Sequence, residues 1–127
     1  MKLTELERTA LDWFAGFYCD DLPLLARHLK SATPISRENT GNGFFTGLAV
    51  SPASTPQLID CPSPLDGLRV RFEGMTEGLE LLLFFKDGYA HQLEGYAIAG
   101  EVTSSIDLET APFVASDMWP KKKVTND

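Results

Sequence analysis

The stretch that decides the fold is Leu79-Glu-Leu-Leu-Leu-Phe-Phe-Lys-Asp-Gly-Tyr-Ala-His-Gln-Leu-Glu-Gly-Tyr96. Its first part, 79–85, is apolar on both sides of the pleat and predicts a central strand covered above and below. Asp87 and Gly88 then predict a type I′ turn, because both central residues of that turn need a positive φ. The strand from 89 to about 98 is therefore expected to fold back on 79–85.

The strand before this hairpin is predicted from a strict alternation of apolar and charged side chains. Leu68, Val70 and Phe72 alternate with charged side chains, which is the period-two pattern of a strand with one wet face. The two strands of the hairpin each hold one carboxylate, Glu80 and Glu94, and a two-residue turn would set Glu94 opposite Leu81. We expect a cross-strand pair with Arg69 or Arg71 to satisfy these groups. The alternatives are carboxylates that line a cleft for acid–base chemistry and carboxylates that contact a partner.

Two helices are predicted ahead of the strands. Thr4 and Glu7 form a capping box. The helix that follows is expected to end near 16–19, and its apolar stripe consists of Leu6, Ala10, Trp13, Phe14 and Phe17. Asp20 and Asp21 are expected to cap a short second helix, with basic residues, His28 among them, in its last turn. Its expected apolar face consists of Leu22, Leu25, Ala26 and Leu29.

The remaining segments complete the prediction of fold class. Residues 35–50 predict a hairpin around a Gly/Asn turn, or a loop that leads into a strand over about 44–50. The segment 51–66, with four prolines, predicts a surface connection, and 102–106 a further strand. The order of elements predicts an α+β fold, in which two N-terminal helices pack on one face of a mostly antiparallel sheet of four to five strands. We expect one domain over 1–120 and a frayed tail over 121–127.

Composition narrows the class of protein. With 127 residues, 43% hydrophobic content and two cysteines, the chain is expected to form one core without disulfides, in a reducing compartment. It shows no signal peptide and no apolar run long enough to span a bilayer, so a cytoplasmic location is expected. The net charge of −7 disfavours nucleic acid and membrane as partners. Residues 73–117 hold nine acids against Lys86 alone, which indicates an acidic interaction surface or a solvated acidic face.

The sequence contains no recognisable metal-binding, phosphate-binding or catalytic motif. Two histidines occur, and no Cys-x-x-Cys or His-Glu-x-x-His pattern accompanies them, so no metal site is predicted. The Gly41-Asn-Gly43 pair lacks the lysine of a phosphate-binding loop. We predict no catalytic residue and no cofactor, and the sequence favours a non-enzymatic role.

Two stretches resemble a group of small bacterial proteins. They are 37–46, Arg-Glu-Asn-Thr-Gly-Asn-Gly-Phe-Phe-Thr, and the hairpin 82–89 leading into Leu-Glu-Gly-Tyr at 93–96. Some proteins that look like this are similar to immunity proteins of bacterial toxin systems. The resemblance implies the fold and a bacterial origin, and it implies no active site. It draws attention to five residues of the first loop, Arg37, Glu38, Thr40, Gly41 and Gly43.

The favoured hypothesis is a non-enzymatic protein-binding domain, an immunity-type inhibitor whose acidic half docks on a basic toxin such as a nuclease. Its expected partner-binding residues are Asp87, Glu94, Glu101, Asp107 and Glu109. One alternative is a homodimeric module that associates through a sheet edge or through Phe44, Phe45 and Trp119. Another is a small-molecule-binding or hydrolytic domain that uses the Arg37–Glu38 loop and Glu94.

Overall fold

The Asp87–Gly88 turn joins the two central strands of the sheet, as predicted. In the computed structural model, which describes residues 1–119, β4 (Leu79–Lys86) pairs with β5 (Tyr89–Ala97) in antiparallel fashion. Asp87 and Gly88 have φ angles of 54° and 80°, so the turn has the two positive φ values that its residue types favour. The expected tail, 121–127, and Pro120 lie outside the described residues.

All neighbouring strands of the sheet run antiparallel. The sheet has six strands in the order β1-β2-β5-β4-β3-β6, one more strand than the upper bound expected from the sequence. The outer strands comprise β1 (Thr33–Asn39), β2 (Gly43–Ala49), β3 (Leu65–Phe72) and β6 (Phe113–Asp117). β6 was missed, and the strand expected at 102–106 is irregular. Four of the five residues of β6 are exposed, so no apolar alternation marks it in the sequence.

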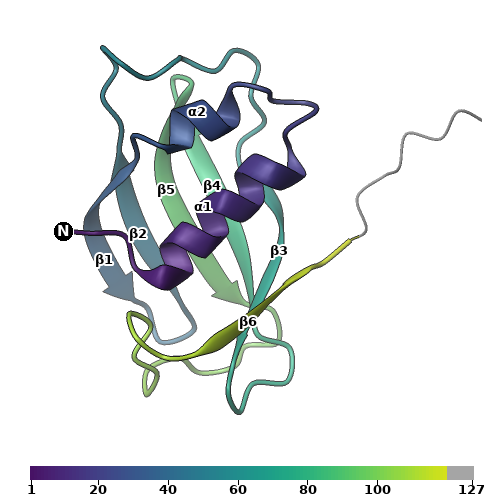
Figure 1. Cartoon of the computed structure of the whole chain (residues 1–127). Helices are drawn as coiled ribbons and strands as arrows, with labels where there is room; N and C mark the ends of the chain where they lie inside the picture. Colours follow the sequence, from purple (N-terminus) through teal and green to yellow (C-terminus); the bar gives the residue numbers. More distant parts are fainter. Residues whose placement is uncertain (120–127) are drawn as a thin grey trace, which may run out of the picture.

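Two helices cover one face of this sheet. Figure 1 shows α1 (Glu5–Phe17) lying diagonally across the strands and α2 (Leu25–Leu29) beside the β4–β5 turn. The capping box of α1 is present, with Thr4 and Glu7 bonded in both directions. The prediction for α2 was wrong at its start, because the helix begins after Leu24 and receives no side-chain cap from Asp20 or Asp21.

The core lies between the helices and the inward side chains of the strands. Leu68, Val70 and Phe72 point into it, as their alternation predicts, together with Leu81 and Leu83 of β4. The opposite face of β4 carries Leu82 and Phe84, which are only partly buried. The expectation of a central strand covered above and below was therefore wrong, since within residues 1–119 both helices lie on one side.

A β-bulge changes the register of the central hairpin. The pairing passes from Phe85↔Ala90 to Phe84↔Gln92, so His91 is the extra residue on β5. Glu94 consequently stands opposite Leu82, and Leu81 stands opposite Gly95. The predicted pairing of Glu94 with Leu81 was wrong by this one residue. The shift moves Glu94 to the face that the helices leave uncovered.

Candidate functional site

The long connection 98–112 crosses one end of the sheet and is fastened to the β1–β2 turn. The backbone N–H of Thr103 donates to the carbonyl oxygen of Gly41 at 2.7 Å, and the N–H of Gly43 donates to the Thr103 hydroxyl at 2.9 Å. Asn39 adds a bond from its Nδ2 to the Thr103 carbonyl oxygen at 2.9 Å. Thr103 is fully buried, so this part of the connection belongs to the folded core.

The same connection is fastened to the β3–β4 turn through Glu101. Its carboxylate accepts hydrogen bonds from the backbone N–H groups of Gly78 at 2.8 Å, Thr76 at 2.7 Å and Glu77 at 2.9 Å. These bonds, those from Gly78 and Thr76 first, lower the pKa of Glu101. Glu101 therefore has a structural role that its charge alone did not predict.

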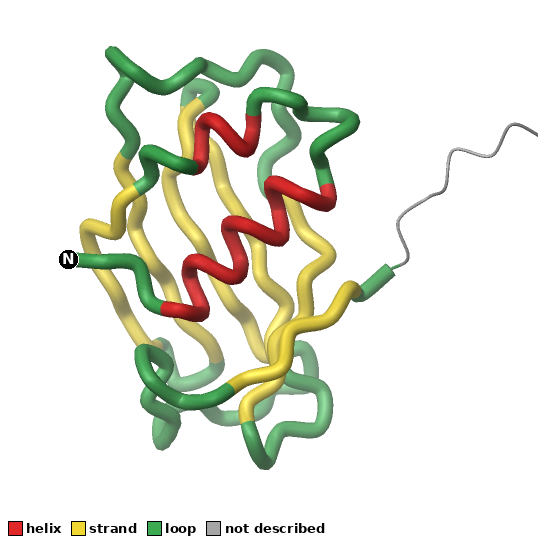
Figure 2. Tube along the Cα trace, in the orientation of Figure 1, coloured by secondary structure: helices red, strands yellow, loops and turns green. Residues whose placement is uncertain are grey.

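Three loops thus meet at this end of the sheet, and together they are strongly acidic. They are the turns 40–42 and 73–78 and the connection 98–112, visible at the lower end of the molecule in Figure 2. These loops contain five acidic residues and no Lys, Arg or His. We call the five the acidic end: Glu73, Glu77, Glu101, Asp107 and Glu109.

A partly buried ion pair lies beside the acidic end. The Glu7 side chain is 3% exposed and accepts bonds from Arg37 Nε at 2.8 Å and Arg37 Nη2 at 2.7 Å. It also accepts from the Thr46 hydroxyl at 2.7 Å and the Thr4 N–H at 2.8 Å. Burial alone would raise the pKa of Glu7, but the bonds from Arg37, Thr4 and Thr46 outweigh it, and the pKa is lowered. Each Glu7 oxygen receives two bonds, so the pair is fully satisfied.

Arg37 also reaches toward the connection 98–112. Its Nη1 lies 3.5 Å from Glu109 Oε1, and its Nη2 donates to the carbonyl oxygen of Lys2. Glu109 is 63% exposed, so this outer contact is a weak surface pair, whereas the inner contact with Glu7 is buried. Arg37 thereby connects the start of α1, strand β1 and the acidic end.

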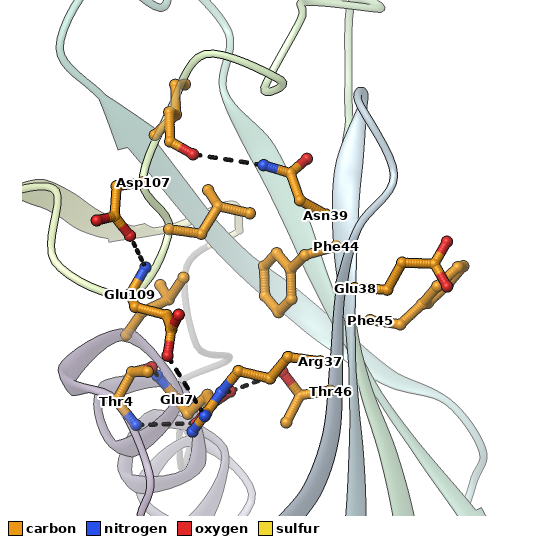
Figure 3. A pocket seen from close by; sticks show the side chains of 13 residues that line it. Thr4, Glu7, Arg37, Glu38, Asn39, Phe44, Phe45, Thr46, Asp107 and Glu109 are labelled. Atoms are coloured by element: carbon orange, nitrogen blue, oxygen red, sulfur yellow. Dashed lines mark hydrogen bonds and ion pairs between the residues drawn. The ribbon is translucent and has the colours of Figure 1, made fainter.

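A cleft of about 250 Å³, with both apolar and polar walls, opens between these elements. Figure 3 shows Phe44 facing it between Arg37 and the loop that carries Asp107 and Glu109. Its apolar lining comprises Leu6, Phe44, Phe45, Ile106 and Leu108. The Asp107 carboxylate stabilises the loop itself, since it accepts from the Glu109 N–H at 3.1 Å and the Thr110 hydroxyl at 2.8 Å.

The residues of 37–43 to which the resemblance draws attention have different positions and roles. Arg37 lies in the cleft, while Glu38 and Phe45 point to the other side of the sheet in Figure 3. Gly41 and Gly43 have φ angles of +93° and +145° and shape the turn, and Thr40 closes it by a backbone bond to Gly43 at 3.0 Å. Both residues line the cleft, but consecutive strand residues face opposite sides, so the side chains of Arg37 and Glu38 point away from each other.

The expected partner-binding residues do not form one surface either. Three of them, Glu101, Asp107 and Glu109, lie at the acidic end. Asp87 lies in the β4–β5 turn at the opposite end of β5, and Glu94 lies on the uncovered face of the sheet. For the homodimer alternative, Phe44 is 4% exposed and buried in the core, whereas Trp119 is 46% exposed.

The two carboxylates on the uncovered face do not form the predicted ion pair with Arg69 or Arg71. The Tyr96 hydroxyl donates to Glu80, which raises the pKa of Tyr96 to about 12. Arg69 stands opposite Glu80 in the register but forms its ion pair with Glu77 at 3.2 Å. Burial raises the pKa of Glu94, and within residues 1–119 no ion pair joins Glu94 to an arginine.

Two residues that sequence reasoning undervalued are Glu7 and His28. Glu7 lies within the apolar stripe of α1, three residues before Ala10, and this position was the available signal. His28 lies in the last turn of α2, as predicted, but its side chain is fully buried, with its Nδ1 2.8 Å from the Pro56 carbonyl oxygen. Its Nε2 accepts from the Ala90 N–H at 2.9 Å. His28 is therefore committed to the core.

A second hollow, of about 550 Å³, lies between the two helices and the start of β1. In contrast to the acidic rim of the cleft, the border of this hollow is basic. It includes Lys2, Arg8 and Lys30 beside Asp12. We regard the cleft as the better candidate site, because the Glu7–Arg37 ion pair and the hydrogen-bonded loops hold its walls in place. Across residues 1–119, no group of three or more His, Cys, Asp or Glu side chains could hold a metal ion. Neither described helix is long and apolar enough to cross a membrane.

No family model matches the chain, and neither a curated protein nor a solved structure matches it.

Proposed function

We propose that this chain is a non-enzymatic domain that binds a basic protein through its acidic end, as an immunity-type inhibitor of a basic bacterial toxin such as a nuclease would. The observation that carries the proposal is the composition of the three loops, five carboxylates without a basic residue, at one end of the sheet. Charge of one sign gathered on one surface speeds the encounter with a partner of opposite charge and selects against other partners.

The rigidity of these loops supports the proposal. Hydrogen bonds that involve the side chains of Glu101, Thr103 and Asn39 fix the connection 98–112 to both neighbouring turns. A surface that is ordered before binding loses little conformational entropy when a partner docks. The acidic end is therefore suited to binding without prior folding of the loops.

Every residue of the acidic end except Glu101 is exposed and therefore accessible to a partner. Glu77 and Glu109 are 48% and 63% exposed, and their contacts with Arg69 and Arg37 are 3.2 and 3.5 Å long. Exposed pairs of this kind contribute only about 0–1 kcal/mol. A basic partner can therefore compete for both carboxylates at small cost.

The test is a charge reversal at the acidic end. The probes are a panel of purified cationic nuclease domains of bacterial toxins, with association followed by stopped-flow fluorescence across a salt series. We expect one probe to bind with a dissociation constant below about 1 µM at about 0.15 M salt. In the variant Glu73→Lys/Glu77→Lys/Glu109→Lys, its association rate should fall at least tenfold and lose most of its salt dependence.

The matched control is Asp12→Lys/Asp20→Lys/Asp21→Lys, which changes the net charge equally but away from the acidic end. Its association rate should fall much less than that of the first variant. Equal rates for the two variants, or no probe that binds, would reject the proposal. Both variants should keep the wild-type melting temperature within a few degrees.

A homodimeric module is the second candidate, and the uncovered face of the sheet favours it. Phe45, Glu94 and Leu82 lie in one row across β2, β5 and β4, with Phe84 next to it. Sedimentation of the wild-type chain separates the two candidates. A stable dimer that is insensitive to salt would support the second, and a monomer supports the first.

A further inference from the structure

The cleft at the acidic end combines apolar walls with a negative rim. Phe44 and Leu6 are 4% and 3% exposed and form its floor, and Ile106 and Leu108 are half-buried beside them. This lining suits the hydrocarbon part of a long side chain, because such a stem loses little by leaving water for an apolar surface.

The charges around the cleft do not cancel. Glu7 and Arg37 neutralise each other through two short hydrogen bonds. Asp107 and Glu109 remain on the rim, and Glu109 reaches Arg37 only at 3.5 Å. The rim therefore has a net negative charge, which repels a carboxylate or phosphate and attracts a cation.

The size of the cleft limits its occupant. Its volume of about 250 Å³ is below the roughly 300–1,000 Å³ of pockets for drug-sized molecules. A single side chain inserted from a protein surface is a better match than a metabolite. Interfaces place such anchoring side chains in pockets like this one, and arginine is among the commonest.

We propose that the cleft receives one arginine side chain of the basic partner, with its stem on Phe44, Ile106 and Leu108 and its guanidinium between Asp107 and Glu109. This inference rests on the proposed function and names the anchor of the docking surface. Arginine fits better than lysine, because its guanidinium is more weakly hydrated and pairs with carboxylates through two parallel hydrogen bonds.

Small probes test the cleft without the partner. N-butylguanidinium carries the stem and the charge, N-butylurea has the same planar shape without charge, and n-butylammonium stands for lysine. In nuclear magnetic resonance titrations, butylguanidinium should shift the amide signals of residues 106–109 saturably, with a dissociation constant on the order of 1–10 mM. Butylurea should bind at least tenfold more weakly, and butylammonium should fall between the two.

Three variants locate the binding. Glu109→Gln removes one rim charge and should weaken butylguanidinium binding at least fivefold, and Leu108→Trp should abolish it by filling the cleft. Glu73→Gln removes a charge of the acidic end outside the cleft and should leave binding unchanged. Equal binding of butylurea, shifts elsewhere on the molecule, or weakening by Glu73→Gln as large as by Glu109→Gln would overturn the proposal.

The partner experiment separates this inference from the proposed function. If Leu108→Trp binds the basic partner as tightly as the wild-type chain while the triple reversal does not, the acidic end is the docking surface and the arginine anchor is wrong. If the triple reversal binds the partner normally, the proposed function fails, and the butylguanidinium titration then decides only whether the cleft holds a cation.

Discussion

At the scale of single residues, His28 shows how burial determines protonation. Both ring nitrogens are bonded inside the core: because Nε2 accepts from the Ala90 N–H, the proton of the neutral ring lies on Nδ1 and is donated to Pro56. A second proton would have to replace the bond from Ala90. Burial accordingly lowers the pKa of His28 from its ordinary value.

This residue predicts an acid-sensitive stability. As the pH falls through about 6.5, the ordinary histidine value, the unfolded chain binds a proton at His28 before the folded chain does. The free energy of unfolding should therefore be insensitive to this group above that pH and decrease below it. Urea unfolding of His28→Leu should show a loss of about 1–3 kcal/mol at neutral pH, from two unsatisfied backbone groups, and a shallower decrease toward acid.

The matched variant is His91→Ala, because His91 is exposed on the β5 bulge. It should retain the wild-type decrease of stability below about pH 6.5. A variant of His28 with an unchanged pH profile would show that another group causes the acid sensitivity.

At the scale of elements, the β1–β2 hairpin depends on two glycines for different reasons. Gly41 has a φ of +93° and nothing within 4 Å of an added Cβ. Gly43 has a φ of +145°, and a Cβ there would lie 2.0 Å from the carbonyl oxygen of Gly95 in β5. The first glycine serves the turn alone, and the second also permits close approach of two strands.

The two alanine variants should therefore differ in stability. Gly41→Ala should cost about 1–2 kcal/mol, the ordinary penalty of a positive φ with a side chain. Gly43→Ala should cost at least twice as much, because β2 and β5 must separate to admit the methyl group. Chemical denaturation measures both losses, and equal values would contradict the close approach of Gly43 to Gly95.

At the scale of the whole molecule, the helices cover one face of the sheet and leave the other to solvent. Neighbouring residues of β4 report on this asymmetry, since Leu83 is fully buried while Leu82 is only partly buried on the other side. Leu83→Ala should cost about 2–5 kcal/mol, the range for emptied core positions. Leu82→Ala should cost less than half as much. Similar losses in urea unfolding would mean that something covers both faces.

The distribution of acidic residues is also a property of the whole molecule. The sequence shows the acidic excess of residues 73–117, but only the fold divides it among four places. Five carboxylates gather at the acidic end, Glu80 and Glu94 lie on the uncovered face, and Asp87 lies at the opposite end of the sheet. Asp117 lies on the edge strand β6 and accepts a hydrogen bond from Trp13 Nε1. A partner that touches the acidic end therefore cannot use all of the predicted residues at once.

The sequence by itself determined the local structure of this protein. The capping box of α1, the Asp87–Gly88 turn and the alternation of β3 all depend on backbone preferences and on side-chain periods of neighbouring residues. Such signals lie within a few positions of one another. They are readable without knowledge of any distant contact.

Only the tertiary structure decided the candidate site. The cleft brings together Glu7, Arg37 and Glu109, which are separated by 30 and 72 residues in the sequence. The bulge at His91 shifts the pairing of β5, and this shift decides which face receives Glu94. Ion pairs between distant residues and one-residue register shifts leave no periodic trace, because their energy depends on burial and approach across the sheet.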